Sequence, residues 1–238
     1  MEPRHYYDEF SRSYDREREE GYHALVDQLE AEIVLAHCRG ARVLEAGCGT
    51  GMVLRRVAPE ARLAVGADLS HGMVGHAAGR GLRVVAASIL HLPFADGVFD
   101  VAYSLKVLAH VREIDSALAE LARVVRPGGV VLAEFYNPFS LRYLAKSLAG
   151  PGKVGERLTE AAVFTRWDPP WRIAGYLPPT LRLERFHGVR VFTPAAAFHR
   201  VPLVGRALAR AERWATRTAL PGPRVLGGFV IAELKRSD

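Results

Sequence analysis

Short apolar runs alternate with segments of helical spacing over the first 135 residues. Five apolar runs are predicted to form strands: residues 42–46, 63–67, 82–87, 99–104 and 130–135. Helices are predicted between them by apolar residues near helical spacing: residues 21–38, the pattern after Gly51 up to Val57, 70–79 and 113–125. Strands and helices that alternate in this way form a parallel sheet with right-handed crossovers. The pattern therefore predicts an α/β fold.

The regular pattern is lost after Phe135. A helix is favoured at 138–148, whereas the stretch 150–182 is rich in Pro, Gly and Trp and shows no clean period. Three further elements are predicted: a strand at 183–192, a helix at 203–219 and a strand at 228–234. We expect one domain over residues 1–238, with three attached segments: an N-terminal arm at 1–20 and cap or insertion segments at 136–182 and 194–223.

The composition is that of a globular protein with a sizeable core. Hydrophobic residues make up 49% of the 238 residues and charged residues 24%. No apolar run approaches the length of a membrane span, about 18 residues. The segment 1–20 is dense in charge and aromatic residues, which is not typical of a signal peptide. Only Cys38 and Cys48 are present, which excludes a disulfide scaffold and favours a cytoplasmic location.

The positive charge is concentrated in the C-terminal third. Residues 1–150 hold 17 Lys and Arg against 19 Asp and Glu, whereas residues 151–238 hold 15 against 7. Most of these basic residues are Arg, which reflects either genomic base composition or a preference for an anionic substrate, nucleic acid or lipid head groups. No nucleic-acid-binding motif is present, so charge alone is thin support for a nucleic-acid partner.

The helix at 203–219 carries a stripe of arginines: Arg206, Arg210, Arg213 and Arg217. Helical spacing places an apolar set toward one side: Leu203, Ala207, Leu208, Ala211 and Trp214. Such a helix either lies on a membrane surface or gathers anions, or it covers the sheet with a solvated basic face. We favour the solvated face.

A glycine-rich loop joins the first predicted strand to the following helix. Gly47, Gly49 and Gly51 allow the backbone to turn sharply and to approach a ligand closely, although a tight structural turn needs the same residues. Ligands of open parallel sheets bind beyond the carboxyl ends of the strands, where this loop is placed. Met52 stands where a dinucleotide fingerprint has its third glycine, so the loop does not predict NAD binding.

Asp68 closes the second predicted strand. An acid in that position accepts hydrogen bonds from the ribose hydroxyls of an adenosine-containing ligand. The alternative is a helix N-cap, because Asp68 and Ser70 both precede a helix. We favour ligand binding, since Asp68 coincides with the glycine loop.

Five segments in order resemble the class I S-adenosylmethionine-dependent methyltransferases, in the branch (type 11) that includes ubiquinone and menaquinone methyltransferases. They are residues 7–15 (YDEFSRSYD), 43–51 (VLEAGCGTG), 92–101 (LPFADGVFDV), 108–111 (LAHV) and 121–129 (LARVVRPGG). The resemblance implies a Rossmann-like, seven-stranded, mostly parallel sheet with helices on both faces and an antiparallel last strand. It also implies methyl transfer from S-adenosylmethionine, with S-adenosylhomocysteine as the product and no metal.

The resemblance implies cofactor contacts from the arm, the glycine loop and the strand ends: Tyr14, Glu45, Gly47, Cys48, Gly49, Gly51, Asp68, Leu69, Met73, Ser88, Ile89, Ser104 and Leu105. Glu45 and the loop backbone would hold the methionine end, and Asp68 the ribose. The family often has an acid where Ser88 stands, so the contact of Ser88 with the adenine amino group is a weaker one.

Residues of the arm and of the late segments are the candidates for the acceptor side: Tyr6, Tyr7, Tyr136, Asn137, Phe139, Phe164, Trp167 and Trp171. Each aromatic among them is equally explained as core. The candidate catalytic groups are His110, His187, Asp168 and Tyr14. For His110, packing or a hydrogen bond at a helix end is an alternative role. The histidines have no metal-ligand spacing.

Three functions fit these observations. The first is a methyltransferase for a small-molecule acceptor of natural-product or quinone type, aromatic or anionic, working as a monomer or homodimer. The second is a methyltransferase for a peptide, lipid or nucleic acid, attracted by the basic C-terminal third. The third is a catalytically silent partner subunit that binds S-adenosylmethionine. We favour the first, and the intact glycine loop argues against the third.

Overall fold

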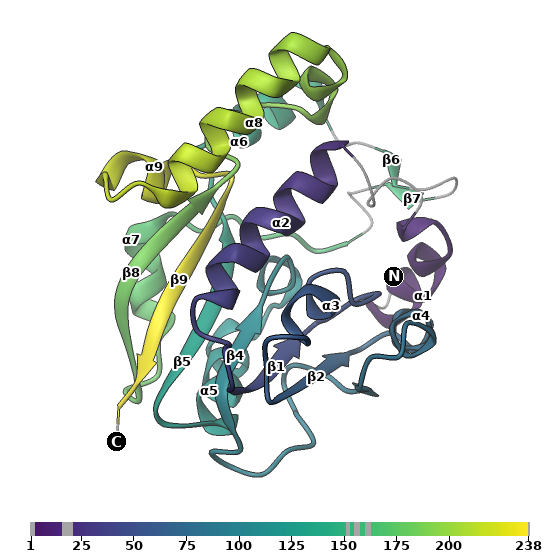
Figure 1. The fold of residues 1–238 in the computed structure, drawn as a ribbon, viewed down its shortest axis with the longest axis vertical. Coiled ribbons are helices and arrows are strands. Elements are labelled where there is room, and N and C mark those ends of the chain that lie inside the picture. The colour runs from purple at the N-terminus through teal and green to yellow at the C-terminus, as the bar shows by residue number, and fades with distance from the viewer. Residues whose placement is uncertain (1–2, 16–20, 151–152, 155–157, 160–162, 238) are drawn as a thin grey trace.

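Seven strands form one sheet in the order β3-β2-β1-β4-β5-β9-β8 (Figure 1). The computed structural model describes residues 3–15, 21–150, 153–154, 158–159 and 163–237. The strand bounds are β1 Arg42–Ala46, β2 Leu63–Asp68, β3 Val84–Ala86, β4 Phe99–Ser104, β5 Val125–Tyr136, β8 Leu181–Val189 and β9 Phe229–Arg236. The first five are parallel, and β9 pairs antiparallel with both β5 and β8. The predicted fold class is confirmed.

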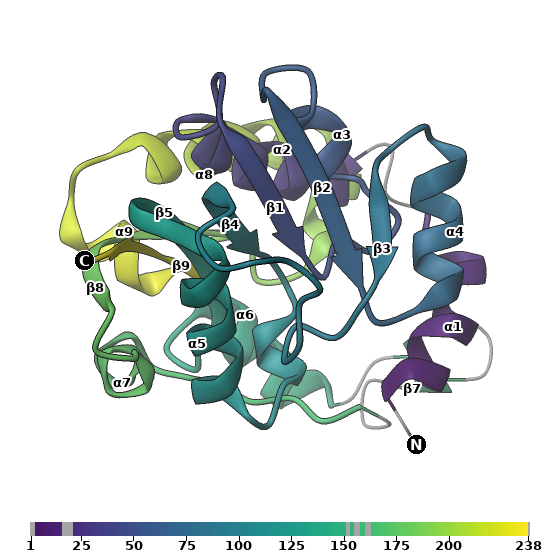
Figure 2. The same cartoon turned by 90° about the horizontal axis from the view of Figure 1, so that it is seen from below.

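Helices lie on both faces of this sheet (Figure 2). Their bounds are α1 Pro3–Tyr14, α2 Gly21–Leu35, α3 Leu54–Val57, α4 His71–Gly79, α5 Ile114–Val124, α6 Leu141–Ala149, α7 Pro170–Ile173, α8 Pro202–Arg217 and α9 Pro221–Leu226. Short 3-10 turns are η1 Leu108–His110, η3 Ala174–Tyr176 and η4 Ala196–Arg200, and β6 Lys153–Val154 pairs with β7 Leu158–Thr159. In Figure 2, α2, α3 and α8 cover one face, and α5 and α7 cover the other.

The core has two parts because side chains of a strand alternate between the two faces of the sheet. Val43 of β1 packs with Leu29 and Val34 of α2 in one cluster. Its neighbour Leu44 packs with Leu118 of α5 in the other cluster. Strands covered on both faces read as continuous apolar runs, and for that reason they could be predicted from the sequence.

The strand register brings two loops together at the carboxyl edge of the sheet. Ala46 of β1 pairs with Ala67 of β2, so Gly47 and Asp68 follow on neighbouring strands. Asp68 in turn pairs with Ala86 of β3, two residues before Ser88. Residues that lie 41 positions apart along the chain, Gly47 and Ser88, therefore face one edge.

Two predicted strand boundaries need correction. The fifth strand begins at Val125 and contains the Pro127–Gly129 segment that we expected to form a turn before it. Gly128 has a φ of 71°, and the register against β4 shifts in this part of the ladder. The strand predicted at 183–192 ends at Val189, because Arg190 adopts the left-handed conformation with a φ of 59°.

The apolar side that we predicted for α8 is not the buried side of the helix. Leu203 is 79% exposed and Trp214 is 51% exposed. The buried residues of α8 are Glu212 and Ala215. The carboxylate of Glu212 accepts hydrogen bonds from backbone N–H groups that follow β8, including that of Val191 at 2.8 Å. A polar contact thus selects the buried face of the helix, and hydrophobic spacing does not show it.

The arginine stripe of α8 is divided between two roles. Arg213 donates to Gln28 Oε1 of α2 at 3.2 Å, and Arg217 donates to Glu32 Oε2 at 3.1 Å. Arg206 and Arg210 are exposed. Half of the predicted stripe therefore fixes α8 to α2.

The predicted division into one domain with an arm and two cap segments stays a prediction. Parts of the arm (residues 1–2 and 16–20) and of the first cap segment (151–152, 155–157 and 160–162) lie outside the described residues. None of the helices in the described part of the chain is long and apolar enough to cross a membrane.

Candidate functional site

The glycine loop that follows β1 is tied to β2 by its backbone. The N–H groups of Gly47 and Cys48 both donate to Ala67 O, at 2.6 and 3.0 Å. Gly47 has a φ of 84°, and a Cβ built there would lie 2.1 Å from Val107 Cγ2. Gly49 has a φ of 53°, but a Cβ there would meet nothing closer than Tyr14 Cε1 at 4.0 Å. Gly49 therefore borders open space, whereas Gly47 is required by packing.

Asp68 lies beside this loop and fixes its position. Its Oδ2 accepts the Gly49 N–H at 2.8 Å, and its Oδ1 accepts the Ser70 N–H at 2.9 Å. Burial raises the pKa of the Asp68 carboxyl above its usual range. The N-cap of α4 is Ser70, whose hydroxyl accepts the Met73 N–H at 3.1 Å, so the N-cap alternative for Asp68 is wrong.

A cavity of about 650 Å³ opens at this edge of the sheet. It is lined by nine of the thirteen residues predicted to contact the cofactor: Tyr14, Gly47, Gly49, Asp68, Leu69, Met73, Ser88, Ile89 and Leu105. The volume is within the usual range for small-molecule sites, roughly 300–1,000 Å³. Their contacts with a cofactor stay predictions, but the structure brings these nine residues together.

The other four predicted cofactor residues lie behind the described lining. Glu45 is buried and its Oε2 accepts the Tyr103 hydroxyl at 3.0 Å. Burial raises the pKa of Glu45 well above its usual value. Ser104 is fully buried, and its hydroxyl has no hydrogen-bond partner in the described part of the chain. Both residues are buried, and their contacts with a cofactor stay predictions.

Cys48 and Gly51 serve packing inside the loop. The side chain of Cys48 is so close to Gly66 that a Cβ on Gly66 would lie 2.6 Å from Cys48 Sγ. A Cβ on Gly51 would lie 2.3 Å from Leu82 Cδ1. Both residues thus shape the loop from behind, whereas Gly49 and Gly47 are at the cavity.

Helix α1 lies against the cofactor side of the cavity and is held there by two aspartates. Asp8 Oδ1 accepts from the Ser70 hydroxyl at 2.5 Å and from the Gly72 N–H at 3.1 Å. Asp15 accepts from the Thr50 hydroxyl at 2.7 Å and forms an ion pair with Arg80 at 2.7 Å. Sequence reasoning missed both. Their spacing of seven residues, two helical turns, is the signal that places them on one face.

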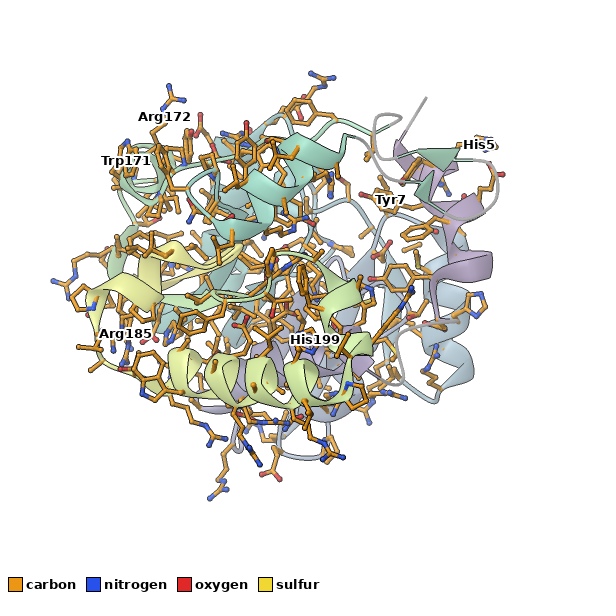
Figure 3. The ribbon with its side chains drawn as sticks, turned by 90° about the horizontal axis from the view of Figure 1, so that it is seen from above. His5, Tyr7, Trp171, Arg172, Arg185 and His199 are labelled. Atoms are coloured by element: carbon orange, nitrogen blue, oxygen red, sulfur yellow. The ribbon has the colours of Figure 1, made fainter. Side chains whose placement is uncertain are left out.

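The docked helix carries three tyrosines into the site. Tyr6, Tyr7 and Tyr14 line the cavity. Figure 3 shows Tyr7 extending inward from α1. Burial, the largest cause, raises the pKa of the Tyr7 hydroxyl, which therefore stays protonated in neutral solution. Tyr7 is thus a hydrogen-bonding and packing group at this position.

His110 lies at the same cavity, at the end of η1. Its Nδ1 is 2.8 Å from Phe164 O. Because a carbonyl oxygen only accepts, Nδ1 carries the hydrogen, and in the neutral ring Nε2 carries the lone pair. The ring lies edge-on to Tyr136, with 5.6 Å between centroids. His110 is thus a candidate proton acceptor with its tautomer fixed.

A second cavity of about 320 Å³ adjoins the first. The two share six described lining residues: Tyr6, Tyr7, Tyr14, Lys106, His110 and Val163. Tyr136 lines the second cavity and Phe164 the first, as expected for the acceptor side. The shared lining includes the candidate base, so both cavities border His110.

Four predicted acceptor residues are absent from the described lining of both cavities. Asn137 is buried, and its amide donates to Val225 O at 2.8 Å. Phe139 and Trp171 pack against each other at 4.9 Å between centroids, and Trp171 is 67% exposed. Figure 3 places Trp171 on the far side of the molecule from Tyr7. Trp167 packs on Tyr136 from behind, at 5.5 Å.

Two candidate bases also lie away from the described lining. Asp168 is buried and forms an ion pair with Arg166 at 2.7 Å, and it accepts the Tyr176 hydroxyl at 2.8 Å. His187 Nε2 is 2.8 Å from Glu233 Oε2 of the neighbouring strand β9. Both side chains are engaged in structural contacts, so the structure does not support them as bases.

Sequence reasoning also missed a buried charged cluster under the second cavity. Lys106, which has a φ of 60°, donates from Nζ to Asp27 Oδ1 at 2.8 Å and to Glu30 Oε2 at 2.6 Å. Its N–H donates to Glu134 Oε1 at 3.1 Å. Burial raises the pKa of Glu134 well above its usual value. The two acids at spacing three on the apolar face of α2 were the signal for this cluster.

Among the described residues, no group of three or more His, Cys, Asp or Glu side chains is placed to hold a metal ion.

Residues 44–133 match the family model described as a methyltransferase domain. This segment is similar to methyltransferase domains. It runs from β1 into β5 and includes the glycine loop, Asp68 and His110. The predicted family resemblance is confirmed for this segment.

The relatives agree with the family model. A demethylmenaquinone methyltransferase of Corynebacterium urealyticum is 35% identical over 136 residues, covering 52% of this chain and 58% of the relative. One of Mycolicibacterium vanbaalenii is 40% identical over 98 residues, covering 41% and 43%. The chain spans about half the length of the curated relatives it matches.

A solved structure supports the fold over nearly the whole chain. A SAM-dependent methyltransferase from Thermotoga maritima superposes with a TM-score of 0.68 at 18% identity, covering 98% of this chain and 99% of that one. At this level of identity the likeness shows the fold alone.

Proposed function

We propose that this protein is an S-adenosylmethionine-dependent methyltransferase acting on a small-molecule acceptor of quinone or natural-product type. The observation that carries the proposal is the pairing of Asp68 with Gly49 at a cavity bordered by α1. The methyltransferase domain contains this pair, and the names of the relatives favour a quinone-type acceptor.

The residues of the first cavity fit the cofactor. An ionised carboxylate offers about four lone-pair positions, and the N–H groups of Gly49 and Ser70 take one position on each oxygen of Asp68. It therefore keeps acceptor capacity for the two ribose hydroxyls. The open space at Gly49 admits a ligand close to the backbone. When bound, S-adenosylmethionine supplies an activated methyl group on its sulfonium.

Each part of the cofactor has a matching set of residues. Leu69, Met73 and Ile89 offer apolar surface for the adenine. Ser88 accepts the Leu90 N–H at 3.2 Å, and its hydroxyl hydrogen stays available for a ring nitrogen. The backbone of Gly47 and Gly49 would hold the methionine end.

The acceptor side is aromatic and is bordered by α1. Tyr6, Tyr7 and Phe164 offer flat apolar surface to a ring-shaped acceptor. Exclusion of water and alignment of the acceptor are the main contributions that a protein makes to methyl transfer, since the methyl group is already activated. Helix α1 is thus a functional part of the site in this proposal.

His110 is the proposed proton acceptor. A hydroxyl or activated carbon acid that attacks a methyl group loses a proton, and Nε2 of His110 has the lone pair to take it. Phe164 O orients the ring by accepting from Nδ1. General base catalysis contributes about 10²–10⁴-fold to rate.

The test is transfer of a labelled methyl group from S-adenosylmethionine to a naphthohydroquinone, followed by mass spectrometry. We expect a methylated acceptor and S-adenosylhomocysteine in equal amounts. His110→Gln should lower kcat by about 100-fold or more. The matched control is His76→Gln, an exposed histidine of α4, which should leave kcat unchanged. Binding of S-adenosylmethionine without transfer to any quinol or phenol would overturn the proposal.

A further inference from the structure

The second cavity is lined by cations. Arg142, Lys146 and Arg190 line it together with the shared Lys106. These residues come from α6, from the end of β8 and from the end of β4, and tertiary folding alone brings them together. Whether the positive charge of these side chains is compensated depends on the carboxylates that contact them in the described part of the chain.

Lys106 and Arg190 are accounted for by contacts within the protein. Lys106 is paired with Asp27 and Glu30. Arg190 donates from Nε to Thr193 O at 3.0 Å and from Nη2 to Pro194 O at 2.7 Å.

Glu212 is the carboxylate whose charge acts on Arg190. Its oxygens already accept hydrogen bonds from the backbone. It accepts the backbone N–H groups of Val191, Phe192 and Thr193, at 2.8 to 3.0 Å. It holds the turn after β8 and does not enter the cavity lining.

Arg142 is different, because it meets aromatic rings in place of acceptors. Its guanidinium carbon lies 4.3 Å from the Tyr136 centroid and 4.8 Å from those of Trp167 and Phe229. Among the described residues no carboxylate or carbonyl accepts from it, and Nη1 is enclosed with no hydrogen-bond partner. A partly buried guanidinium normally has an anionic or carbonyl partner, because loss of hydration is costly. The guanidinium of Arg142 therefore stacks on aromatic rings, and Arg142 lines the cavity.

We propose that the second cavity binds an anionic group of the acceptor, a carboxylate or a phosphate ester, through Arg142. This inference rests on the proposed function, because it assigns the acceptor of the same site. The rest of the acceptor extends past Tyr6 and Tyr7, and its reacting atom lies at the boundary between the cavities, near His110. The acceptor is therefore an aromatic or quinol compound with an acidic arm.

The aromatic surroundings suit this ligand as well as the cations do. Arg142 is stacked, so its planar donors are oriented before a ligand arrives, and less conformational freedom is lost on binding. Carboxylates and phosphates match the planar fork of a guanidinium. A neutral amide of the same shape offers a single carbonyl and no charge.

The test is calorimetric titration of the full chain, saturated with S-adenosylhomocysteine, using three probes of similar size: benzoate, phenyl phosphate and benzamide. We expect benzoate or phenyl phosphate to bind at least 10-fold more tightly than benzamide. The tighter of the two anions identifies the acidic group. Raising the salt concentration should weaken the binding of the two anions and leave the binding of benzamide unchanged.

Two variants complete the test. Arg142→Gln should weaken anion binding at least 10-fold, while the affinity for S-adenosylhomocysteine stays that of the wild type. Arg206→Gln removes an exposed arginine of α8 outside the cavity and should change neither.

Equal binding of all three probes, or full anion affinity in Arg142→Gln, would overturn the inference. If Arg142→Gln does not fold, the wild-type comparison of the three probes decides alone. Failure of S-adenosylhomocysteine to bind wild-type protein overturns the proposed function instead, so the two failures are distinguishable.

Discussion

The cofactor side of the cavity is formed by the ends of three neighbouring strands, whereas the acceptor side is formed by segments that meet only through side chains. Gly47 and Ser88 follow β1 and β3, and Asp68 ends β2, the strand between them. Tyr7 comes from α1 and His110 from η1, and Phe164 lies in a loop far along the chain. The first arrangement is set by the backbone ladder. The second depends on a few polar contacts, chiefly those of Asp8 and Asp15.

This difference predicts separate responses to mutation. Changes at the strand ends lower cofactor binding, and those that disturb packing, as at Gly47, also destabilise the sheet. Changes at the contacts of α1 release the acceptor side and leave the sheet intact. Helix α1 alone is too short to be stable without its docking contacts.

The largest effect is expected for Gly47→Ala. The new Cβ would overlap Val107, and the backbone has a φ of 84°. Overpacking costs about 1–3 kcal/mol, and the left-handed conformation costs about 1–2 kcal/mol more. Urea unfolding and titration with S-adenosylhomocysteine should both show a loss. Gly81→Ala is the control, since its φ is 77° but nothing lies within 4 Å; it should cost only the backbone strain.

Asp68→Ala should weaken the binding of S-adenosylhomocysteine by roughly 2–4 kcal/mol, because two charge-assisted hydrogen bonds to the ribose are lost. The melting temperature should fall much less. Ser140→Ala removes the N-cap of α6, whose hydroxyl accepts the Tyr143 N–H at 3.2 Å. That control should lose about 1 kcal/mol of stability with no change in cofactor affinity. The opposite pattern would make Asp68 a purely structural residue.

Asp8→Ala combined with Asp15→Ala should release α1. We expect kcat/KM for the acceptor to fall by about 10-fold or more, because the hydrogen bonds at each aspartate contribute about 0.5–1.5 kcal/mol each. The affinity for S-adenosylhomocysteine should fall less, since the hydrogen bonds of Asp68 with Gly49 and Ser70 remain. Steady-state kinetics and calorimetry on one preparation measure both. Equal losses would show that the two sides are not separate.

The smallest effect is expected on acidification, which should abolish cofactor binding and the docking of α1 at different pH values. Burial raises the pKa of Asp68, so its carboxylate, and with it cofactor affinity, is lost at a higher pH than for an ordinary aspartate. Hydrogen bonds from Ser70 and Gly72 lower the pKa of Asp8. The docking energy of Asp8 is present above its unfolded pKa and is lost only as the pH falls through its lowered folded value. Cofactor binding should therefore fail before α1 undocks, as followed by calorimetry and by tyrosine fluorescence.

The cofactor side could be predicted from the sequence because its determinants are local. The glycines, Asp68 and the apolar runs follow one another at fixed spacing, and parallel pairing then places them at one edge. Glu45 and Ser104 lie outside the described lining of the cavity because both are buried in strands. Motif spacing does not show this.

The acceptor side could be predicted only in part. Tyr6, Tyr7 and His110 were expected at the site, but Trp171 is exposed far from it and Asp168 is bound to Arg166. Contacts such as that of Asp8 with Ser70 join residues 62 positions apart, and no local pattern encodes them. The burial of Glu212 on α8 is of the same kind, since a polar contact decides the face of the helix.

The most direct measurement is calorimetric titration of the wild-type chain and of Asp68→Ala with S-adenosylhomocysteine and with NAD. The account predicts that S-adenosylhomocysteine binds the wild type at one site and that Asp68→Ala binds it at least about 30-fold more weakly, the factor that corresponds to about 2 kcal/mol. NAD should bind neither. Saturable binding of NAD, with no response to S-adenosylhomocysteine, would contradict the account.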